Sequence, residues 1–339
     1  MERFLLHALG GVTLILGLLL ASLPSAFAGQ NIVINTSINH SVAGNGDSSN
    51  NGAWPAGGFS HFPASVEGNS VTVNSGGKVD EVDLRVYGGA AYGISGVVTV
   101  TGNRVTVNSG GITRDVIGGF ASGGVNTTAV GNNVTISGGS AKEVSGGYAI
   151  SSTMATATDN TVTVSGGTIS GDIYGGFAYA GTNTGNETDT GNSAATGNTI
   201  TISSGTINGH VYGGLAYNDI SAPASTSNTI ILGGNPTFGT DSALVGGHRV
   251  GSRGDVFTGN TLKIHNYTGS AVKRIWNFAS YDFLLPVSLE PLKVTERVYF
   301  ERSGGDAETS RVTNVNLTEG GSAPKVGDKI TLIHAVGGF

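Results

Sequence analysis

The chain has 339 residues, of which 57 are glycine and none is cysteine, and its formal net charge is −6. Glycine does not recur at every third position and proline is rare, which excludes collagen, while regularly placed aliphatic and aromatic residues in a hydrophobic fraction of 38% exclude disorder. The 17 basic residues are spread thinly, which excludes nucleic acid and anionic lipid as partners and leaves a turn-rich repeat protein.

The N-terminal segment has the pattern of a signal peptide. A basic start precedes the apolar stretch 8–20, and the small-residue triplet Ala26-Phe27-Ala28 follows as a cleavage site. We expect residues 1–28 to be removed on export, which predicts a cell-surface, extracellular or periplasmic location. An uncleaved anchor is the alternative, because a bilayer-spanning helix needs about 20 apolar residues. Without cysteine, the exported fold must be held by stacking and backbone pairing alone.

Internal repetition is the strongest signal in the chain. After a predicted N-terminal cap at 29–67, seven segments open with Gly, Asp or Ser followed by Asn and continue as a short strand of alternating apolar and polar residues. Their asparagines are Asn69, Asn103, Asn132, Asn160, Asn198, Asn228 and Asn260. The shortest step, from Asn132 to Asn160, is 28 residues, and the longest, from Asn160 to Asn198, is 38.

Within a repeat the order of elements is constant. The first strand is followed by a Gly-rich turn, where glycine adopts positive φ without steric cost. A second strand then ends in a Gly pair, and an aromatic or aliphatic residue and Ala often follow. Examples of the second strand are Val86-Tyr87-Gly88-Gly89, Ile173-Tyr174-Gly175-Gly176 and Val211-Tyr212-Gly213-Gly214. The stretches of variable length that precede the next Asn are predicted loops.

The repeats predict an all-β parallel β-helix, or β-solenoid, over residues 68–264. One pair of short strands is marginal in water, so the copies must stack to bury their apolar faces. Each strand would pair with its counterpart about 4.8 Å away in the next coil. We therefore expect Val105, Val134, Val162 and Ile200 to line up in one interior column. Residues 265–339 carry more charge and more bulky side chains, and we expect them to cap the last coil.

The repeats resemble those of autotransporter passenger domains, which commonly read G-N-T-V-T-I-S-G-G-T followed by V-Y-G-G-Y/F. Residues 197–217 match this style closely and residues 159–179 nearly so, and the segments 272–278 and 326–333 resemble the stretch that such proteins carry before their membrane barrel. The resemblance implies a β-helical, adhesin-like bacterial surface protein. No series of alternating barrel strands follows Phe283, so we expect a truncated or passenger-only product, associated with an outer membrane only through a barrel supplied elsewhere.

One column of polar residues is a candidate site. Alignment on the second Gly pair brings together Arg85, Asp115, Glu143, Asp172 and His210. Carboxylates one coil apart raise each other's pKa or recruit a cation, so a ladder of calcium or cationic ligand at Asp115, Glu143 and Asp172 is one interpretation. The favoured interpretation is a solvated face on which Arg114 and Lys142 supply the opposite charge. Calcium-binding nonapeptide repeats are absent from the sequence.

Three further patterns have a structural and a functional interpretation. The tripeptide Arg253-Gly254-Asp255 is of the kind that integrins bind in exposed loops, although chance occurrence is the favoured explanation. The asparagines of the repeat starts are expected to form a structural amide ladder rather than a ligand row. Aromatic residues of the second strands could stack on sugars, but packing between coils is favoured. These are Tyr87, Tyr174 and Tyr212, with Phe120, Tyr148 and Phe177 as neighbours.

The sequence offers no catalytic motif: it has no G-x-S-x-G, H-E-x-x-H or Walker sequence, no cysteine nucleophile and no cofactor fingerprint. We therefore expect a non-enzymatic adhesin or structural rod that contacts glycans or proteins of host or neighbouring cells through many weak contacts. A passive spacer is the alternative. A polysaccharide-degrading β-helix enzyme is a distant one, since it would need carboxylates and bases clustered on one face.

Overall fold

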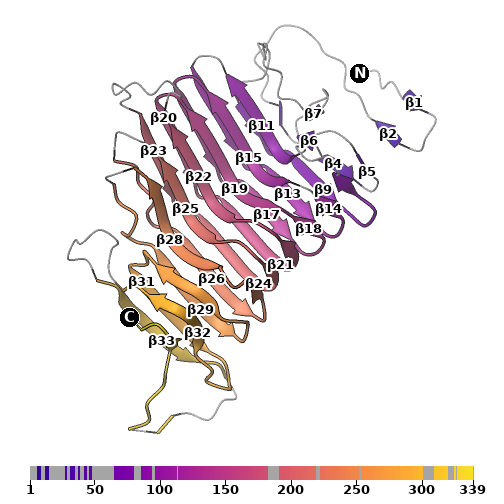
Figure 1. Cartoon of the computed structure of the whole chain (residues 1–339). Coiled ribbons are helices and arrows are strands. Elements are labelled where there is room, and N and C mark those ends of the chain that lie inside the picture. The colour runs from indigo at the N-terminus through magenta and orange to yellow at the C-terminus, as the bar shows by residue number, and fades with distance from the viewer. Residues whose placement is uncertain are drawn as a thin grey trace.

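The computed structural model describes most of the chain from residue 65 onward and short strands before residue 48. The described ranges after residue 64 are 65–79, 85–93, 96–112, 114–181, 191–218, 222–251, 254–300, 309–319, 324–325 and 327–338. All regular secondary structure in these residues is β, and the strands stack side by side along one long axis (Figure 1). The predicted all-β solenoid is confirmed.

Three sheets form the sides of the solenoid, and we name each after the side chains that characterise it. The threonine sheet contains, along its main path, β4 (Asn31–Ile34), β9 (Ser70–Val73), β13 (Arg104–Val107), β17 (Asn133–Ile136), β21 (Thr161–Ile169), β24 (Thr199–Ile207), β26 (Thr229–Gly234), β29 (Thr261–Tyr267), β31 (Ser280–Leu285) and β33 (Arg311–Leu317). Short strands beside this path are β5 (Ser37–Ile38), β10 (Lys78–Val79), β14 (Gly111–Ile112), β18 (Ser140–Ala141) and β27 (Thr237–Phe238).

The other two sheets contain the remaining strands of each coil. The aromatic sheet contains β6 (Val42–Ala43), β7 (Gly46–Asp47), β11 (Val86–Gly93), β15 (Asp115–Gly123), β19 (Glu143–Ser151), β22 (Ile173–Ala180), β25 (Val211–Tyr217), β28 (Ala243–Val250), β30 (Val272–Trp276), β32 (Leu292–Val298) and β34 (Ile333–Ala335). The alanine sheet contains β3 (Phe27–Ala28), β8 (Ser65–Glu67), β12 (Val97–Thr101), β16 (Asn126–Val130), β20 (Met154–Thr158) and β23 (Asn192–Thr196). A separate antiparallel pair joins β1 (Leu6–Ala8) and β2 (Val12–Leu14).

Equivalent strands of successive coils pair in parallel and in register. Val105 pairs with Val134, Val134 with Val162, and Val162 with Ile200. All four side chains are fully buried. The predicted interior column is therefore confirmed, and strands such as β17 alternate half-exposed Asn and Thr with buried Val and Ile.

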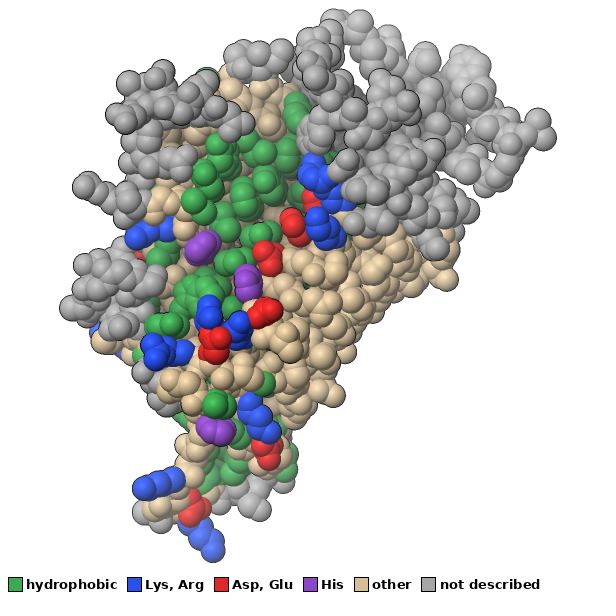
Figure 2. All heavy atoms as spheres, in the orientation of Figure 1, with side chains coloured by type: hydrophobic (Ala, Val, Ile, Leu, Met, Phe, Trp, Pro, Cys, Tyr) green, Lys and Arg blue, Asp and Glu red, His purple; other side chains and the backbone are tan. Residues whose placement is uncertain are grey.

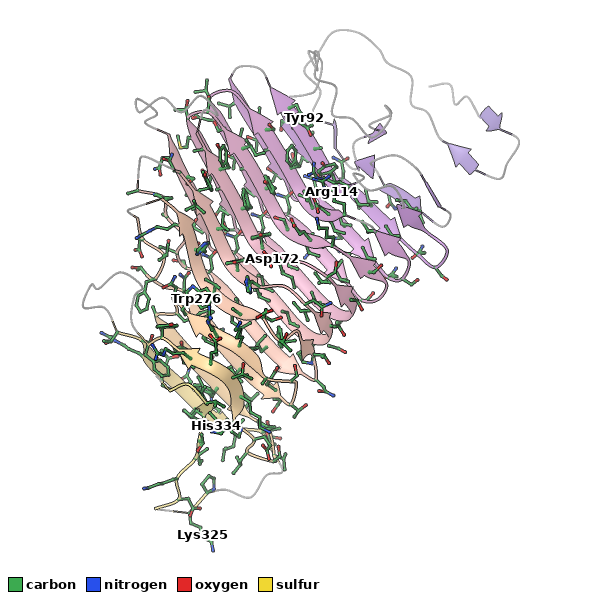
Figure 3. All side chains as sticks on the ribbon, viewed as in Figure 1. Tyr92, Arg114, Asp172, Trp276, Lys325 and His334 are labelled. Atoms are coloured by element: carbon green, nitrogen blue, oxygen red, sulfur yellow. The ribbon has the colours of Figure 1, made fainter. Side chains whose placement is uncertain are left out.

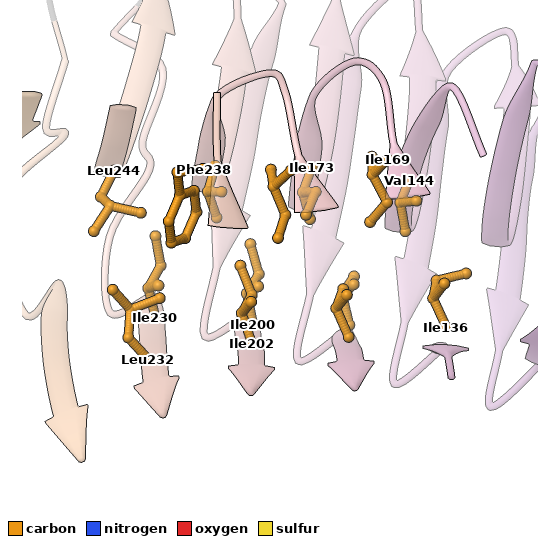
Figure 4. Close-up of a cluster of buried hydrophobic side chains, with 14 of the residues drawn as sticks. Ile136, Val144, Ile169, Ile173, Ile200, Ile202, Ile230, Leu232, Phe238 and Leu244 are labelled. Atoms are coloured by element: carbon orange, nitrogen blue, oxygen red, sulfur yellow. The ribbon is translucent and has the colours of Figure 1, made fainter. Parts of the chain in front are cut away.

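The interior has two compartments of different side-chain size. Large aliphatic residues fill the space between the threonine sheet and the aromatic sheet, and Figure 4 shows them in rows along the axis, with Ile200 and Ile202 below Ile173 and Phe238. Alanines fill the space between the alanine sheet and the aromatic sheet, from Ala129, Ala155, Ala157 and Ala195 on one side and Ala149, Ala178, Ala180 and Ala216 on the other. Small side chains let these two sheets pack closely.

A ladder of asparagine side chains runs along the corner between the alanine sheet and the threonine sheet. From Asn69 to Asn228, the backbone N–H donates to the Oδ1 of the asparagine in the next coil, as from Asn132 to Asn160 and from Asn160 to Asn198, both at 3.0 Å. From Asn103 to Asn228, the Nδ2 donates to the same Oδ1 and also to a backbone carbonyl of the alanine sheet, such as Ala129 O from Asn160 at 2.9 Å. The asparagine ladder comprises Asn69, Asn103, Asn132, Asn160, Asn198, Asn228 and Asn260, all buried. The structural interpretation of this column is confirmed.

The Gly pair of each aromatic-sheet strand packs against this ladder. A Cβ added at Gly147 would lie 2.5 Å from the side chain of Asn160, and one at Gly176 would lie 2.6 Å from that of Asn198. A Cβ at the first glycine of the pair would meet the next coil, as at Gly175, where the carbonyl oxygen of Gly213 lies 2.3 Å away. A side chain at either glycine would therefore clash with the ladder asparagine or with the next coil, which explains why the Gly-Gly motif accompanies the Asn motif in the repeat.

The residue before each ladder asparagine adopts the left-handed conformation. Gly131 and Gly197 have φ values of +63° and +68°. Asp159 and Ser227 stand at the equivalent positions with φ values of +54° and +58°. Because a Cβ is disfavoured in this region, the frequent Gly-Asn start of the repeat reflects a fixed turn between two sheets.

The parallel stack extends past both ends predicted for it. β4 pairs with β9 and β3 pairs with β8, so residues from the predicted N-terminal cap and the predicted cleavage site belong to the sheets. At the other end, β31 pairs with β29 and β33 pairs with β31, and β30, β32 and β34 extend the aromatic sheet. The segment predicted as a C-terminal cap therefore adds coils made of two sheets. Its bulky residues Phe278, Tyr281 and Phe283 lie in the core, and within the described residues these coils form no alanine-sheet strand.

Removing one asparagine of the ladder should destabilise the whole rod. In Asn160→Ala, the backbone N–H of Asn132 loses its side-chain acceptor and the Nδ2 of Asn132 loses one of its two acceptors in a buried environment, and each buried unsatisfied donor costs about 1–3 kcal/mol. We expect the free energy of unfolding in urea to fall by at least that amount. The matched control is Asn133→Ala, whose side chain is half-exposed on the threonine sheet and should change stability little.

A methyl group at the Gly pair should have a similar effect by a different mechanism. In Gly147→Ala, the new Cβ would overlap the Asn160 side chain, and overpacking of this kind costs about 1–3 kcal/mol. The control is Gly111→Ala, where the nearest atom to the new Cβ is the Ser140 hydroxyl at 3.5 Å. Thermal unfolding followed by circular dichroism should show a lower midpoint for the first variant, and equal midpoints would contradict the steric argument.

Candidate functional site: the outer face of the aromatic sheet

Three registered columns of mostly aromatic and aliphatic side chains lie on the outside of the aromatic sheet. The first column contains Tyr87, Ile117, Ser145, Tyr174, Tyr212 and Val245. The second contains Ala90, Phe120, Tyr148, Phe177, Leu215 and His248. The third contains Tyr92, Ser122, Ile150, Tyr179, Tyr217 and Val250. Figure 2 shows them as an apolar strip that follows the long axis of the molecule.

The rings of these columns pack on one another from coil to coil. Tyr148 stacks on Phe177 with centroids 4.2 Å apart, and Tyr174 stacks on Tyr212 at 5.3 Å. Tyr179 lies 4.8 Å from Tyr217 in the third column. The predicted packing between coils is therefore present, and it fixes the side-chain conformations of a surface that carries several coils of aromatic residues.

Exposure of the strip differs along its length. Tyr87, Ile117 and Phe120 are buried, whereas Tyr148, Tyr174, Phe177, Tyr179, Tyr212 and Tyr217 are half-buried. Burial raises the pKa of Tyr148 and of Tyr212 to about 12, with nearby carboxylates adding to the effect. The tyrosine hydroxyls therefore stay neutral hydrogen-bonding groups at physiological pH.

A row of charged residues borders the strip where the aromatic-sheet strands begin (Figures 2 and 3). Asp115 pairs in register with Glu143, and the adjoining pairs align Arg85, Asp172 and His210 with them. The sequence alignment of these five positions is therefore reproduced in space. Their charges are unequally neutralised along the row.

The two ends of the predicted carboxylate column have partners. Asp115 accepts from the Arg85 guanidinium at 2.7 Å and lies 3.5 Å from that of Arg114. Asp172 accepts from the Tyr174 hydroxyl at 3.1 Å and from the backbone N–H of His210 at 2.7 Å. The positive charge beside Asp115 thus comes from Arg85 as well as from the predicted Arg114.

Glu143 lies between these two carboxylates. It is half-buried, and in the described part of the chain its carboxylate forms no ion pair. Burial, followed by the charge of Asp115 and a smaller effect of Asp172, raises its pKa, while Lys142 opposes the shift. Across the described ranges, no three acidic or histidine side chains converge in an arrangement that could hold a metal ion.

The charged row continues over the C-terminal coils in a way that the repeat alignment did not find. Lys273 bridges Asp241 at 2.6 Å and Glu296 at 3.6 Å, and Arg274 pairs with Glu296. Lys273, Arg274 and Glu296 lie after the last repeat start at Asn260, whereas Asp241 belongs to the coil of Asn228, so their position in or just before neighbouring aromatic-sheet strands brings them together. The third aromatic column was also missed, although Tyr179 and Tyr217 follow the Gly pairs at equal distances in sequence.

The Arg-Gly-Asp tripeptide lies only in part within the described residues, which exclude Arg253. Gly254 has a φ value of +119° and its carbonyl accepts from the Arg249 guanidinium. The carboxylate of Asp255 accepts from the backbone N–H groups of Phe257 and Thr258 at 3.0 and 3.1 Å. This carboxylate therefore stabilises a local turn.

Comparison with protein-family models, with curated proteins and with solved structures finds no match. The described residues include no helix of the length and apolarity that a helical membrane crossing requires. The fold and the surface of the solenoid are therefore the basis for a functional proposal.

The position of Glu143 predicts a pH effect on stability. A carboxyl group with a raised pKa in the folded state favours folding below its ordinary value of 4.5, and this contribution is lost as the pH rises through the raised pKa. We expect Glu143→Gln to increase the urea midpoint at about pH 7, and the difference from the parent to shrink near pH 4. The control is Glu67→Gln at an exposed position; a midpoint increase of equal size there would contradict the interpretation.

Proposed function

We propose that this protein is a non-enzymatic, exported adhesive rod of the autotransporter-passenger type, and that it contacts cell-surface glycans through the outer face of the aromatic sheet. The observation that carries the proposal is the registered aromatic strip, whose half-buried tyrosines repeat in successive coils from β19 to β25. Aromatic side chains at a surface combine apolar contact area with a polar hydroxyl, which suits shallow recognition of polyhydroxylated ligands.

The stacked coils support binding through repetition. Each coil offers the same kind of weak contact one strand spacing further along, so a long glycan would engage several coils at once and gain strength by avidity. The bordering carboxylates of Glu143 and Asp172 add hydrogen-bond acceptors beside the rings. The threonine sheet differs, because its outer face presents short hydroxyl and amide side chains with little charge at coils β17, β21 and β24.

A passive spacer is the second candidate. Ring stacking favours it, because rings that stack at 4.2 Å, as Tyr148 and Phe177 do, use their faces on each other and present mainly edges and hydroxyls outward. A spacer would need the rigidity of the columns but no ligand. Binding by the purified rod separates the two candidates.

Substitution on the aromatic strip should weaken glycan or cell binding. We expect Tyr174→Ala with Tyr212→Ala to reduce retention on a glycan array or on cells at least tenfold, because adjacent coils lose contacts together. Tyr174→Phe with Tyr212→Phe keeps the packing and tests the hydroxyls alone. The matched control is Thr163→Ala with Thr201→Ala, two registered positions on the threonine sheet.

Circular dichroism of each variant distinguishes lost binding from lost structure. Equal binding by the aromatic and threonine variants would show that the aromatic strip is not the binding surface. If the unsubstituted protein binds neither glycans nor cells, the passive spacer is the candidate that the result supports.

A further inference from the structure

Two carboxylates in the middle of the charged row have no cation bound to them. Asp115 has arginines beside it. Glu143 and Asp172 follow it in the next two coils, and within the described ranges neither forms an ion pair. The exposed Lys142 precedes Glu143 in the chain but pairs with neither carboxylate. This part of the border of the aromatic strip is therefore negative.

The two carboxylates lie on the same outer face as the rings. Residues two apart in a strand point to one face of a sheet, so Asp172 lies next to Tyr174 and accepts from its hydroxyl at 3.1 Å. Burial is the main reason that the pKa of Tyr212 rises to about 12, and the charge of Asp172 raises it further. The field of this carboxylate therefore reaches the rings of two coils.

The basic residues that form ion pairs lie towards the two ends of the strip. Arg85 and Arg114 are beside Asp115 in the N-terminal coils. Lys273 and Arg274 pair with acidic residues in the C-terminal coils. Figure 2 shows these charged groups along the border of the apolar strip. Between the two ends, a positively charged ligand would meet carboxylates that no described side chain neutralises.

We propose that the aromatic strip selects glycans that carry free amino groups, with Glu143 and Asp172 binding the ammonium groups while the tyrosines contact the sugar rings. This inference rests on the proposed function and adds the charge of the ligand to it. Charge complementarity supports it, because registered carboxylates lie one strand spacing apart, about 4.8 Å, and a cation between them offsets their mutual repulsion. The raised pKa of Glu143, caused first by burial and then by Asp115, is consistent with such repulsion.

A basic peptide has the same charge but fits the rest of the strip less well. The position of Glu143 and Asp172 is occupied by His210 and then by Ala243 in the next two coils, so the row offers no further carboxylate there. The columns beside it continue with tyrosines such as Tyr212, whose hydroxyls are neutral. A ligand with a few cations and many hydroxyl groups therefore gains contacts along the strip that a chain of basic residues would not.

Two matched oligosaccharides test the selection with the full chain. Oligomers of glucosamine and of N-acetylglucosamine of equal length share the sugar ring, and acetylation removes the positive charge of the amine. At a pH at which the amines are charged, we expect at least tenfold tighter binding of the glucosamine oligomer in titration calorimetry, because several weak ion pairs act together. Added salt should weaken this binding more than that of the acetylated oligomer.

Substitution of the two carboxylates should remove the preference. In Glu143→Gln with Asp172→Asn, we expect the ratio of the two affinities to fall to about threefold or less, because the amides carry no charge. The matched control is Glu67→Gln with Asp282→Asn, which changes the net charge equally on the alanine and threonine sheets and should keep the preference. Circular dichroism of both variants should match the parent.

The possible failures are distinguishable. Equal binding of the two oligomers by the parent, or an unchanged preference in Glu143→Gln with Asp172→Asn, would overturn the inference and leave the proposed function in place. Tighter binding of an oligolysine peptide than of the glucosamine oligomer of equal charge would overturn the choice of a glycan. A parent that binds no glycan at all would contradict the proposed function itself.

Discussion

The asparagine ladder holds the three sheets of each coil in a fixed relation. The Asn160 amide donates to Asn198 in the next coil and to Ala129 in the alanine sheet, and its side chain packs against Gly147 of the aromatic sheet. Because these groups are buried, an unmade hydrogen bond would carry its full desolvation cost. The ladder therefore sets the register of the coils from Asn69 to Asn260, and a chain without disulfides can remain a single ordered stack.

Columns of like side chains on the surface follow from this register. Once coils repeat at a constant spacing, any side chain that recurs at one position of the repeat becomes a column, as Tyr174 and Tyr212 show. The same regularity explains why the charged row is neutralised locally: Asp115 has two arginines beside it, whereas Glu143 lies between two carboxylates. At β33, Val312 and Val315 continue the columns of Tyr281 and Phe283 but are exposed.

The fold could be predicted from the sequence because its two periodicities are visible there. Alternation of Val and Thr identifies strands, and the recurrence of Asn identifies coils, so the stacking of Val105 on Val134 could be predicted before any coordinates. The ends of the stack could not be predicted in this way. Residues 265–339 lack the Gly-Asn start, and their bulky side chains suggested a cap. Phe278 and Tyr281 fill the core of these C-terminal coils, in which the described residues form no alanine-sheet strand.

The sequence by itself determined the strands, the solenoid, and the columns to which Asp115, Glu143 and Asp172 belong, because these depend on local periodicity and on equal spacing along the chain. Tertiary structure alone decided how Arg85 and Arg114 share Asp115, why each Gly pair lies against an asparagine, and which valines remain exposed at β33. These features depend on distances between side chains of different coils and on what covers them, and the order of residues does not specify either.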